Sequence, residues 1–267
     1  MLKKILIISV LLVAGLALAA CHSKEAKNTI KVGTIAGPET QLMDVAIKVA
    51  KKRYGLNVVD VPFSDYNTPN EALNDGSLDA NMFQHVPYLN AQIKAHGYKI
   101  VPIGKTFVYP MGIYSKKITS LSQLKEGDKV AIPNDPSNEA RALLLLQKAK
   151  LIRLKPGAGF NATPIDIASN PKHLQFVELG AAQLPRSLSD VTIAAINTNY
   201  AIPAGLSPAK DAFFVEGPDS PYANIVAARE ENKNDPRLKE LVEALHSQEV
   251  LKAAKHIFGD GAIAAWC

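Results

Sequence analysis

Strand-like and helix-like patterns of apolar residues alternate along the first part of the chain. Residues 29–35 alternate apolar and polar side chains, which predicts a β-strand. Between Pro38 and Gly55 the apolar residues recur at helical spacing, and this predicts a helix that the glycine ends. The same alternation continues: strands are predicted at 56–61, 80–83 and 99–102, and helices are predicted to begin within 67–71 and at Pro87 and to end at Gly76 and Gly97.

A second run of the same kind follows. Residues 129–132 predict a strand, and residues 134–137 predict the start of a helix that continues through the leucines at 143–146. Further strands are predicted at 174–179 and 191–196, and further helices at 235–245 and 249–258. Strands that alternate with helices indicate an α/β protein with mainly parallel sheets. Two such runs favour two lobes that close on a ligand by a hinge, although the pattern also allows one continuous domain.

The N-terminus has the pattern of a bacterial export signal. Two lysines precede an apolar run at residues 5–17, which is shorter than the roughly 20 residues that span a bilayer comfortably. Small residues then lead to Cys21, and this arrangement resembles the lipobox of bacterial lipoproteins. It implies a signal peptide at residues 1–20, a lipid anchor on Cys21 and a lipidated tether at residues 21–28. We therefore expect an exported chain, lipid-anchored to a bacterial membrane in the periplasm or at the cell surface. The alternative is an ordinary signal peptide with a cysteine nearby.

Composition and motifs narrow the classes of function. The formal net charge is +5, two of these charges lie in the leader, and so weak an excess does not argue for nucleic-acid binding. If Cys21 is acylated, Cys267 has no intrachain partner, and we expect no disulfide. The sequence has no phosphate-binding loop, no serine-nucleophile elbow and no His-Glu-x-x-His pair, and its histidines lack metal-ligand spacing. We predict no catalytic site, no metal and no cofactor.

Candidate binding residues stand at the predicted junctions of strands and helices. Arg141 lies in the opening turns of a predicted helix, where the partial positive charge of the helix end disfavours a cation. An anion bound there would be held by the guanidinium and by free backbone N–H groups. The other candidates are aromatic, imidazole and amide side chains: Tyr66, Phe83, His85, Tyr88, Asn197 and Asn224.

Each candidate also has an ordinary structural interpretation. Arg141 alone is more often a solvated helix charge, Asn197 a turn residue, and an aromatic side chain part of the core or the rim. Asp135 or Ser137 is expected to cap the helix. An arginine fork combined with amides and aromatics nevertheless suits a free amino acid with an apolar side chain.

Several longer segments carry a resemblance to a known family. They lie at residues 66–73, 79–85, 87–89, 106–110, 133–138, 183–188, 196–201 and 220–222. On these segments the chain resembles the NlpA-type lipoproteins, which include methionine-binding components of ABC importers. The resemblance runs from about Lys31 to Trp266, with two departures: Gly180 stands where the family often has Glu, and a terminal Cys267 is unfamiliar.

The resemblance implies a two-lobed type II periplasmic binding-protein fold with the ligand in the cleft between the lobes. Lobe 1 would comprise residues 29–108 and 225–267, and lobe 2 residues 109–224. The implied ligand-binding residues are Arg141 for the substrate carboxylate, Asn197 and Asn224 for the carboxylate and ammonium ends, Tyr66, Phe83, His85 and Tyr88 for the side-chain pocket, and Asn138 as a weaker candidate. We expect Arg141→Ala and Asn224→Ala to weaken binding without unfolding the chain.

The implied partners are methionine or a close analogue, the permease and ATPase complex of an ABC transporter, and a membrane through the anchor on Cys21. The family's ligands include L-methionine, D-methionine and short methionine-containing peptides, and all three stay open. Two other functions also stay open. One is a surface lipoprotein with an adhesive or structural role, and the other is an enzyme acting on an amino acid or peptide.

Overall fold

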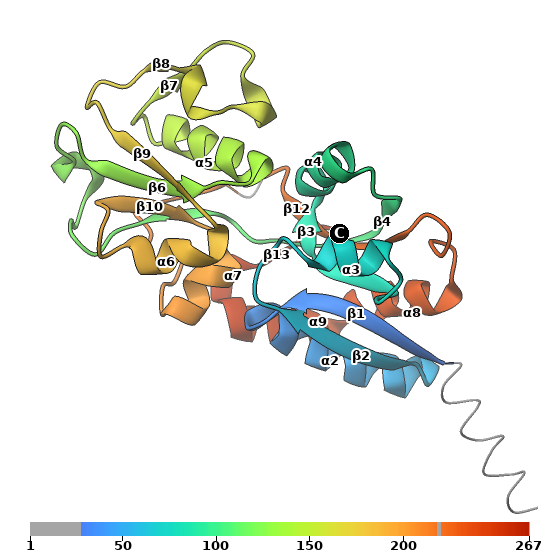
Figure 1. The fold of residues 1–267 in the computed structure, drawn as a ribbon. Helices are drawn as coiled ribbons and strands as arrows, with labels where there is room; N and C mark the ends of the chain where they lie inside the picture. Colours follow the sequence, from blue (N-terminus) through green and yellow to red (C-terminus); the bar gives the residue numbers. More distant parts are fainter. Residues whose placement is uncertain (1–27, 218–219, 267) are drawn as a thin grey trace, which may run out of the picture.

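The computed structural model describes residues 28–217 and 220–266. The predicted signal peptide, Cys21, most of the predicted tether and Cys267 lie outside these residues. Within them the chain forms two α/β lobes, each built on its own sheet (Figure 1). No helix in the described ranges is long and apolar enough to cross a membrane.

The first lobe contains a six-stranded sheet in the order β13-β4-β12-β3-β1-β2. Its strands are β1 (Thr29–Ile35), β2 (Asn57–Phe63), β3 (Ala80–His85), β4 (Ile100–Val108), β12 (Ala223–Arg229) and β13 (Ile263–Ala264). Its helices are α2 (Pro38–Tyr54), α3 (Pro69–Asn74), α4 (Val86–His96), α8 (Pro236–Leu245) and α9 (Gln248–Phe258). Helices α2, α8 and α9 pack on one face of the sheet, and α3 and α4 lie on the other (Figure 1).

The second lobe contains a five-stranded sheet in the order β11-β5-β10-β6-β9. Its strands are β5 (Gly112–Tyr114), β6 (Lys129–Pro133), β9 (Gln175–Leu179), β10 (Ile193–Ile196) and β11 (Phe214–Val215), and β7 (Arg153–Leu154) pairs with β8 (Ile167–Ser169) in a separate ribbon. Helix α5 (Pro136–Lys148) belongs to the core on one face, and α6 (Leu184–Ser187) and α7 (Thr198–Ala201) belong to the core on the other.

The chain passes between the lobes twice. The first crossing segment, residues 109–111, joins β4 to β5, and the second, residues 216–217 and 220–222 as described, leads from β11 to β12. Strand β12 begins at Ala223, so Asn224 lies on the sheet of the first lobe.

Local signals account for most element ends. Pro38 opens α2, and Gly55 ends it with a left-handed φ of 68° that favours glycine. The Asp135 carboxylate caps α5 by accepting a hydrogen bond from the backbone N–H of Asn138, as predicted for a helix cap. The strands and helices predicted in the two alternating runs are confirmed, with ends shifted by a few residues.

The predicted sheet direction is only partly right. β1 pairs in parallel with β2 and β3, and β6 pairs in parallel with β9 and β10. β12, however, lies between β3 and β4 and runs antiparallel to both, and β5 is antiparallel to β10. The sequence pattern did not predict β5, β7, β8, β11, β12 or β13, and the strand predicted at 99–102 covers only the start of β4. Five of the six missed strands have only two or three residues, which are too few to show a periodicity.

Candidate ligand-binding site

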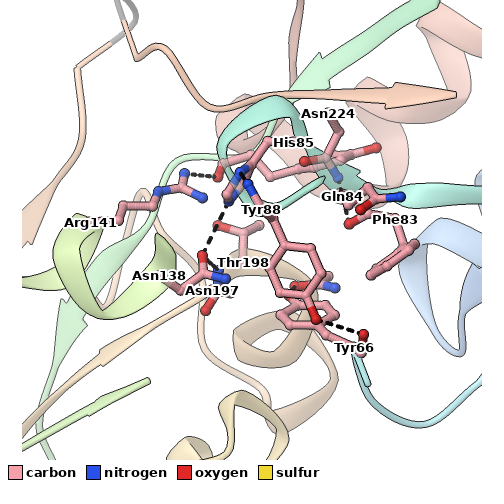
Figure 2. Close-up of a pocket in the computed structure, with 12 residues that line it drawn as sticks. Tyr66, Phe83, Gln84, His85, Tyr88, Asn138, Arg141, Asn197, Thr198 and Asn224 are labelled. Carbon is pink, nitrogen blue, oxygen red and sulfur yellow. Dashed lines mark hydrogen bonds between the residues drawn. The ribbon is translucent and has the colours of Figure 1, made fainter. Parts of the chain in front are cut away.

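A cavity lies between the two lobes, where the carboxyl ends of β3 and β10 meet the start of α5 (Figure 2). Clefts beside the carboxyl ends of strands are the usual ligand sites of α/β folds. The cavity is lined by Tyr66, Phe83, Gln84, His85, Tyr88, Tyr109, Asn138, Arg141, Asn197, Thr198, Asn199 and Asn224. All of the predicted ligand-binding residues are in this set, although their binding of a ligand stays a prediction.

Three aromatic rings form one wall of the cavity. The ring centroids of Tyr66, Phe83 and Tyr88 lie 5.8–5.9 Å apart in tilted and edge-on pairs. The Tyr88 hydroxyl donates a hydrogen bond to the Tyr66 carbonyl at 2.7 Å, and the Tyr66 hydroxyl donates to Asn199 Oδ1 at 2.7 Å. The second bond joins the two lobes. The wall is therefore rigid, and the apolar faces of its rings suit an apolar ligand side chain.

His85 stays neutral in the folded protein. It ends β3 and caps α4, where its Nδ1 accepts a hydrogen bond from the backbone N–H of Tyr88 at 3.1 Å. Burial and the nearby charge of Arg141 lower the pKa of His85 to about 3. Because Nδ1 is an acceptor, the ring proton is on Nε2, which donates to Asn138 Oδ1 at 3.3 Å across the cleft.

Asn138 joins several groups of the second lobe. Its Oδ1 also accepts a hydrogen bond from Asn197 Nδ2 at 2.9 Å, and its Nδ2 donates to both carboxylate oxygens of Asp135 at 3.0 Å. Asn197 Oδ1, in contrast, is buried without a hydrogen-bond partner among the described residues. A buried acceptor without a donor is costly, so this oxygen is suited to receive an N–H group of a ligand.

Arg141 is buried, and part of its guanidinium is already paired. Its side chain is 4% exposed, and its Nε and Nη2 donate to the two carboxylate oxygens of Glu216 at 2.8 and 2.5 Å. Nη2 also donates to the Tyr109 carbonyl at 2.9 Å, and the guanidinium carbon lies 4.4 Å from the centre of the Tyr222 ring. The interpretation of Arg141 as a solvated helix charge is therefore wrong.

The start of α5 offers fewer free N–H groups than expected. Pro136 has no N–H, and Asp135 already accepts the N–H of Asn138. Burial raises the pKa of Asp135, while the hydrogen bonds that it accepts from Asn138 and Ser137 favour its charged form. The cap therefore occupies the position in which an anion would have met the helix end.

A buried carboxyl group lies behind the other end of the cavity. Asn224 Nδ2 donates to Glu39 Oε1 at 3.2 Å and to the Phe83 carbonyl at 3.1 Å, and the Ile35 N–H donates to Glu39 Oε2 at 3.3 Å. Burial raises the pKa of Glu39 well above its ordinary value. No cationic side chain among the described residues forms an ion pair with it. A cationic group brought near would lower this pKa and favour the carboxylate.

The cavity is almost closed in this conformation. The free space enclosed at its centre is about 20 Å³, which is enough for one water molecule. An amino acid can therefore enter only when the lobes or the lining side chains move apart. Within the described ranges, no group of three or more His, Cys, Asp or Glu side chains could hold a metal ion.

Several groups of the site were not predicted from the sequence. Four further residues line the cavity and lie in the segments that carry the family resemblance: Gln84, Tyr109, Thr198 and Asn199. Proximity to those segments could have identified them. Glu216 carried no such signal, and Glu39 has the ordinary position of an acid in the first turn of a helix.

Comparison with known proteins finds relatives over nearly the whole chain. The sequence profile of the NlpA lipoprotein family matches residues 30–266. A protein of Salmonella typhimurium named D-methionine-binding lipoprotein MetQ is 55% identical over 258 residues, which are 96% of this chain and 95% of that protein.

Solved structures share the fold. A periplasmic substrate-binding protein of an ABC transporter from Coxiella burnetii is 74% identical with a TM-score of 0.87, and the match covers 88% of this chain and 100% of that one. A nutrient binding protein from Burkholderia cenocepacia, solved bound to methionine, is 55% identical with a TM-score of 0.87, covering 88% of this chain and 99% of that one. The predicted two-lobed binding-protein fold is confirmed.

Proposed function

The chain belongs to the NlpA lipoprotein family, and we propose that it is the substrate-binding lipoprotein of a methionine transporter. The observation that carries the proposal is the cavity between the lobes, which combines one arginine, the unpaired amide oxygen of Asn197 and an aromatic wall. These groups match the three parts of methionine: its carboxylate, its ammonium group and its thioether side chain.

Each part of the ligand has a matching group. The Nη1 edge of Arg141 makes no hydrogen bond with a described residue and is free to bind the ligand carboxylate. The unpaired Asn197 Oδ1 offers an acceptor for the ammonium group, and Glu39 adds a buried carboxyl group behind Asn224. The rings of the aromatic wall contact the polarizable sulfur. His85 and Asn138 hold the two lobes together beside it.

The test below compares free methionine with a methionine-containing dipeptide, because the cavity must open to admit either one. The carboxylate, ammonium and side-chain groups are the same in both enantiomers, so the proposal covers L- and D-methionine alike. The relatives from Salmonella typhimurium and Burkholderia cenocepacia, whose names mention D-methionine and methionine, support this ligand class.

The protein would act outside the cytoplasm and without catalysis. Anchored through Cys21 to a bacterial membrane, it would capture methionine and deliver it to a permease and ATPase complex of the ABC class. The substrate-binding relative from Coxiella burnetii supports this role. An adhesive surface lipoprotein would keep the fold but would need no cavity with an arginine and an unpaired acceptor.

The test is calorimetric titration of the lipidated protein after unfolding and refolding, which removes ligand retained from the cell. L-Methionine, D-methionine and glycylmethionine are compared, with leucine as the control. We expect submicromolar affinity for methionine and little response to leucine. Absence of binding to all three methionine compounds would refute the proposed function and favour the adhesive role.

A further inference from the structure

Arg141 is bound to both segments by which the chain crosses between the lobes. Its Nη2 donates to the carbonyl of Tyr109 in the first crossing segment, visible as a dashed line in Figure 2. Its Nε and Nη2 also donate to Glu216 in the second crossing segment. Of the five N–H groups of a guanidinium, only the two on Nη1 stay unused by the described residues.

Glu216 is itself held in place by several contacts. Its Oε2 accepts hydrogen bonds from the Met111 N–H at 2.9 Å and from the Ser220 hydroxyl at 3.5 Å. Its own N–H donates to the Met111 carbonyl at 3.0 Å, so backbone and side chain both join the two crossing segments. The Glu216 side chain is 8% exposed. A carboxylate fixed this firmly fixes the plane of the guanidinium that it binds.

From this geometry we infer that Glu216 is a positioning residue for ligand recognition: it aims the Nη1 edge of Arg141 at the ligand carboxylate and connects that contact to both crossing segments. The inference rests on the proposed function. The Arg141–Glu216 pair is neutral as a whole, and so is a zwitterionic amino acid, so binding leaves no net charge buried between the lobes. A ligand on Nη1 would therefore bind to an arginine that the two crossing segments already orient.

Glu216→Gln tests the inference, because an amide cannot replace both carboxylate oxygens. Its NH₂ group would face either the N–H of Met111 or an N–H of Arg141, so at least one hydrogen bond is lost. The measurement is calorimetric affinity of the lipidated protein in detergent for methionine and for methioninol, which has an alcohol in place of the carboxylate. The matched control is Glu249→Gln, which breaks the exposed pair with Arg53.

We expect Glu216→Gln to weaken methionine binding by about 10- to 100-fold, as is usual when the support of a binding group is lost. Methioninol affinity should change far less, and Glu249→Gln should change neither. An equal loss for both ligands would mean that Glu216 is only structural, and tighter methionine binding would mean that it competes with the ligand carboxylate. Either result overturns the inference.

A double variant keeps the test valid if Glu216→Gln fails to fold or methioninol binds too weakly to measure. Removing both charges with Arg141→Gln and Glu216→Gln leaves no unpaired buried ion. If Glu216 acts through Arg141, the double variant should bind methionine no more weakly than Arg141→Gln alone, because the single variant also leaves the Glu216 carboxylate unpaired. A further loss in the double variant overturns the inference. If the unaltered protein does not bind methionine at all, the proposed function fails first.

Discussion

Replacing Arg141 with alanine should cost stability as well as affinity. The sequence alone led us to expect weaker binding in a folded protein, but the structure pairs Arg141 with a buried carboxylate. The two side chains are 4% and 8% exposed, so solvent does little to screen Glu216 once the guanidinium is gone. Removing one partner of a buried ion pair typically costs about 3–5 kcal/mol. For a protein of this size, that corresponds to a melting temperature lower by about 6–20 °C.

The assay is thermal unfolding followed by circular dichroism, with Arg53→Ala as the matched control. Arg53 pairs with Glu249 on the surface, where both side chains are about half exposed, so that loss should lie below about 1 kcal/mol. A paired variant, Arg141→Met with Glu216→Leu, should recover stability but not methionine affinity. If Arg141→Ala melts at the same temperature as Arg53→Ala, the buried ion pair does not stabilise the fold as argued.

Three further predictions follow from other groups of the second lobe and the cleft. Asn224→Ala removes the hydrogen bonds to Glu39 and the Phe83 carbonyl, so methionine affinity measured by calorimetry should fall about tenfold, and unchanged affinity would remove Asn224 from the site. The pKa of His85 is about 3 in the folded protein and near 6.5 in the unfolded chain, so the unfolded state takes up a proton at higher pH. The melting temperature should therefore fall as the pH drops from 7 to 4. His85→Gln should show a shallower fall, and an identical slope would contradict this origin. Burial and the charges of Glu178 and Asp135 raise the pKa of Glu139 to about 7, so its stabilising contribution is lost as pH rises through 7. Glu139→Gln should therefore raise the melting temperature more at pH 8 than at pH 5, and equal shifts would count against it.

The sequence determined the features that depend on neighbouring residues. Export and lipidation signals, strand periodicity and helix ends are local patterns, and the Asp135 cap and the helix end at Gly55 are present where they were predicted. The candidate ligand-binding residues stand at strand–helix junctions, and in an α/β fold such junctions meet at one edge of the sheets. For this reason the predicted residues lie together around one cavity.

Only the tertiary structure decided how those residues are paired. Arg141 and Glu216 are separated by 75 positions, and Glu39 and Asn224 by 185, so no local periodicity connects them. The insertion of β12 between β3 and β4 brings Asn224 to the cleft, and it too depends on pairing between distant segments. A local pattern records which face of an element is buried, whereas the partner of a buried charge depends on which elements the fold brings into contact.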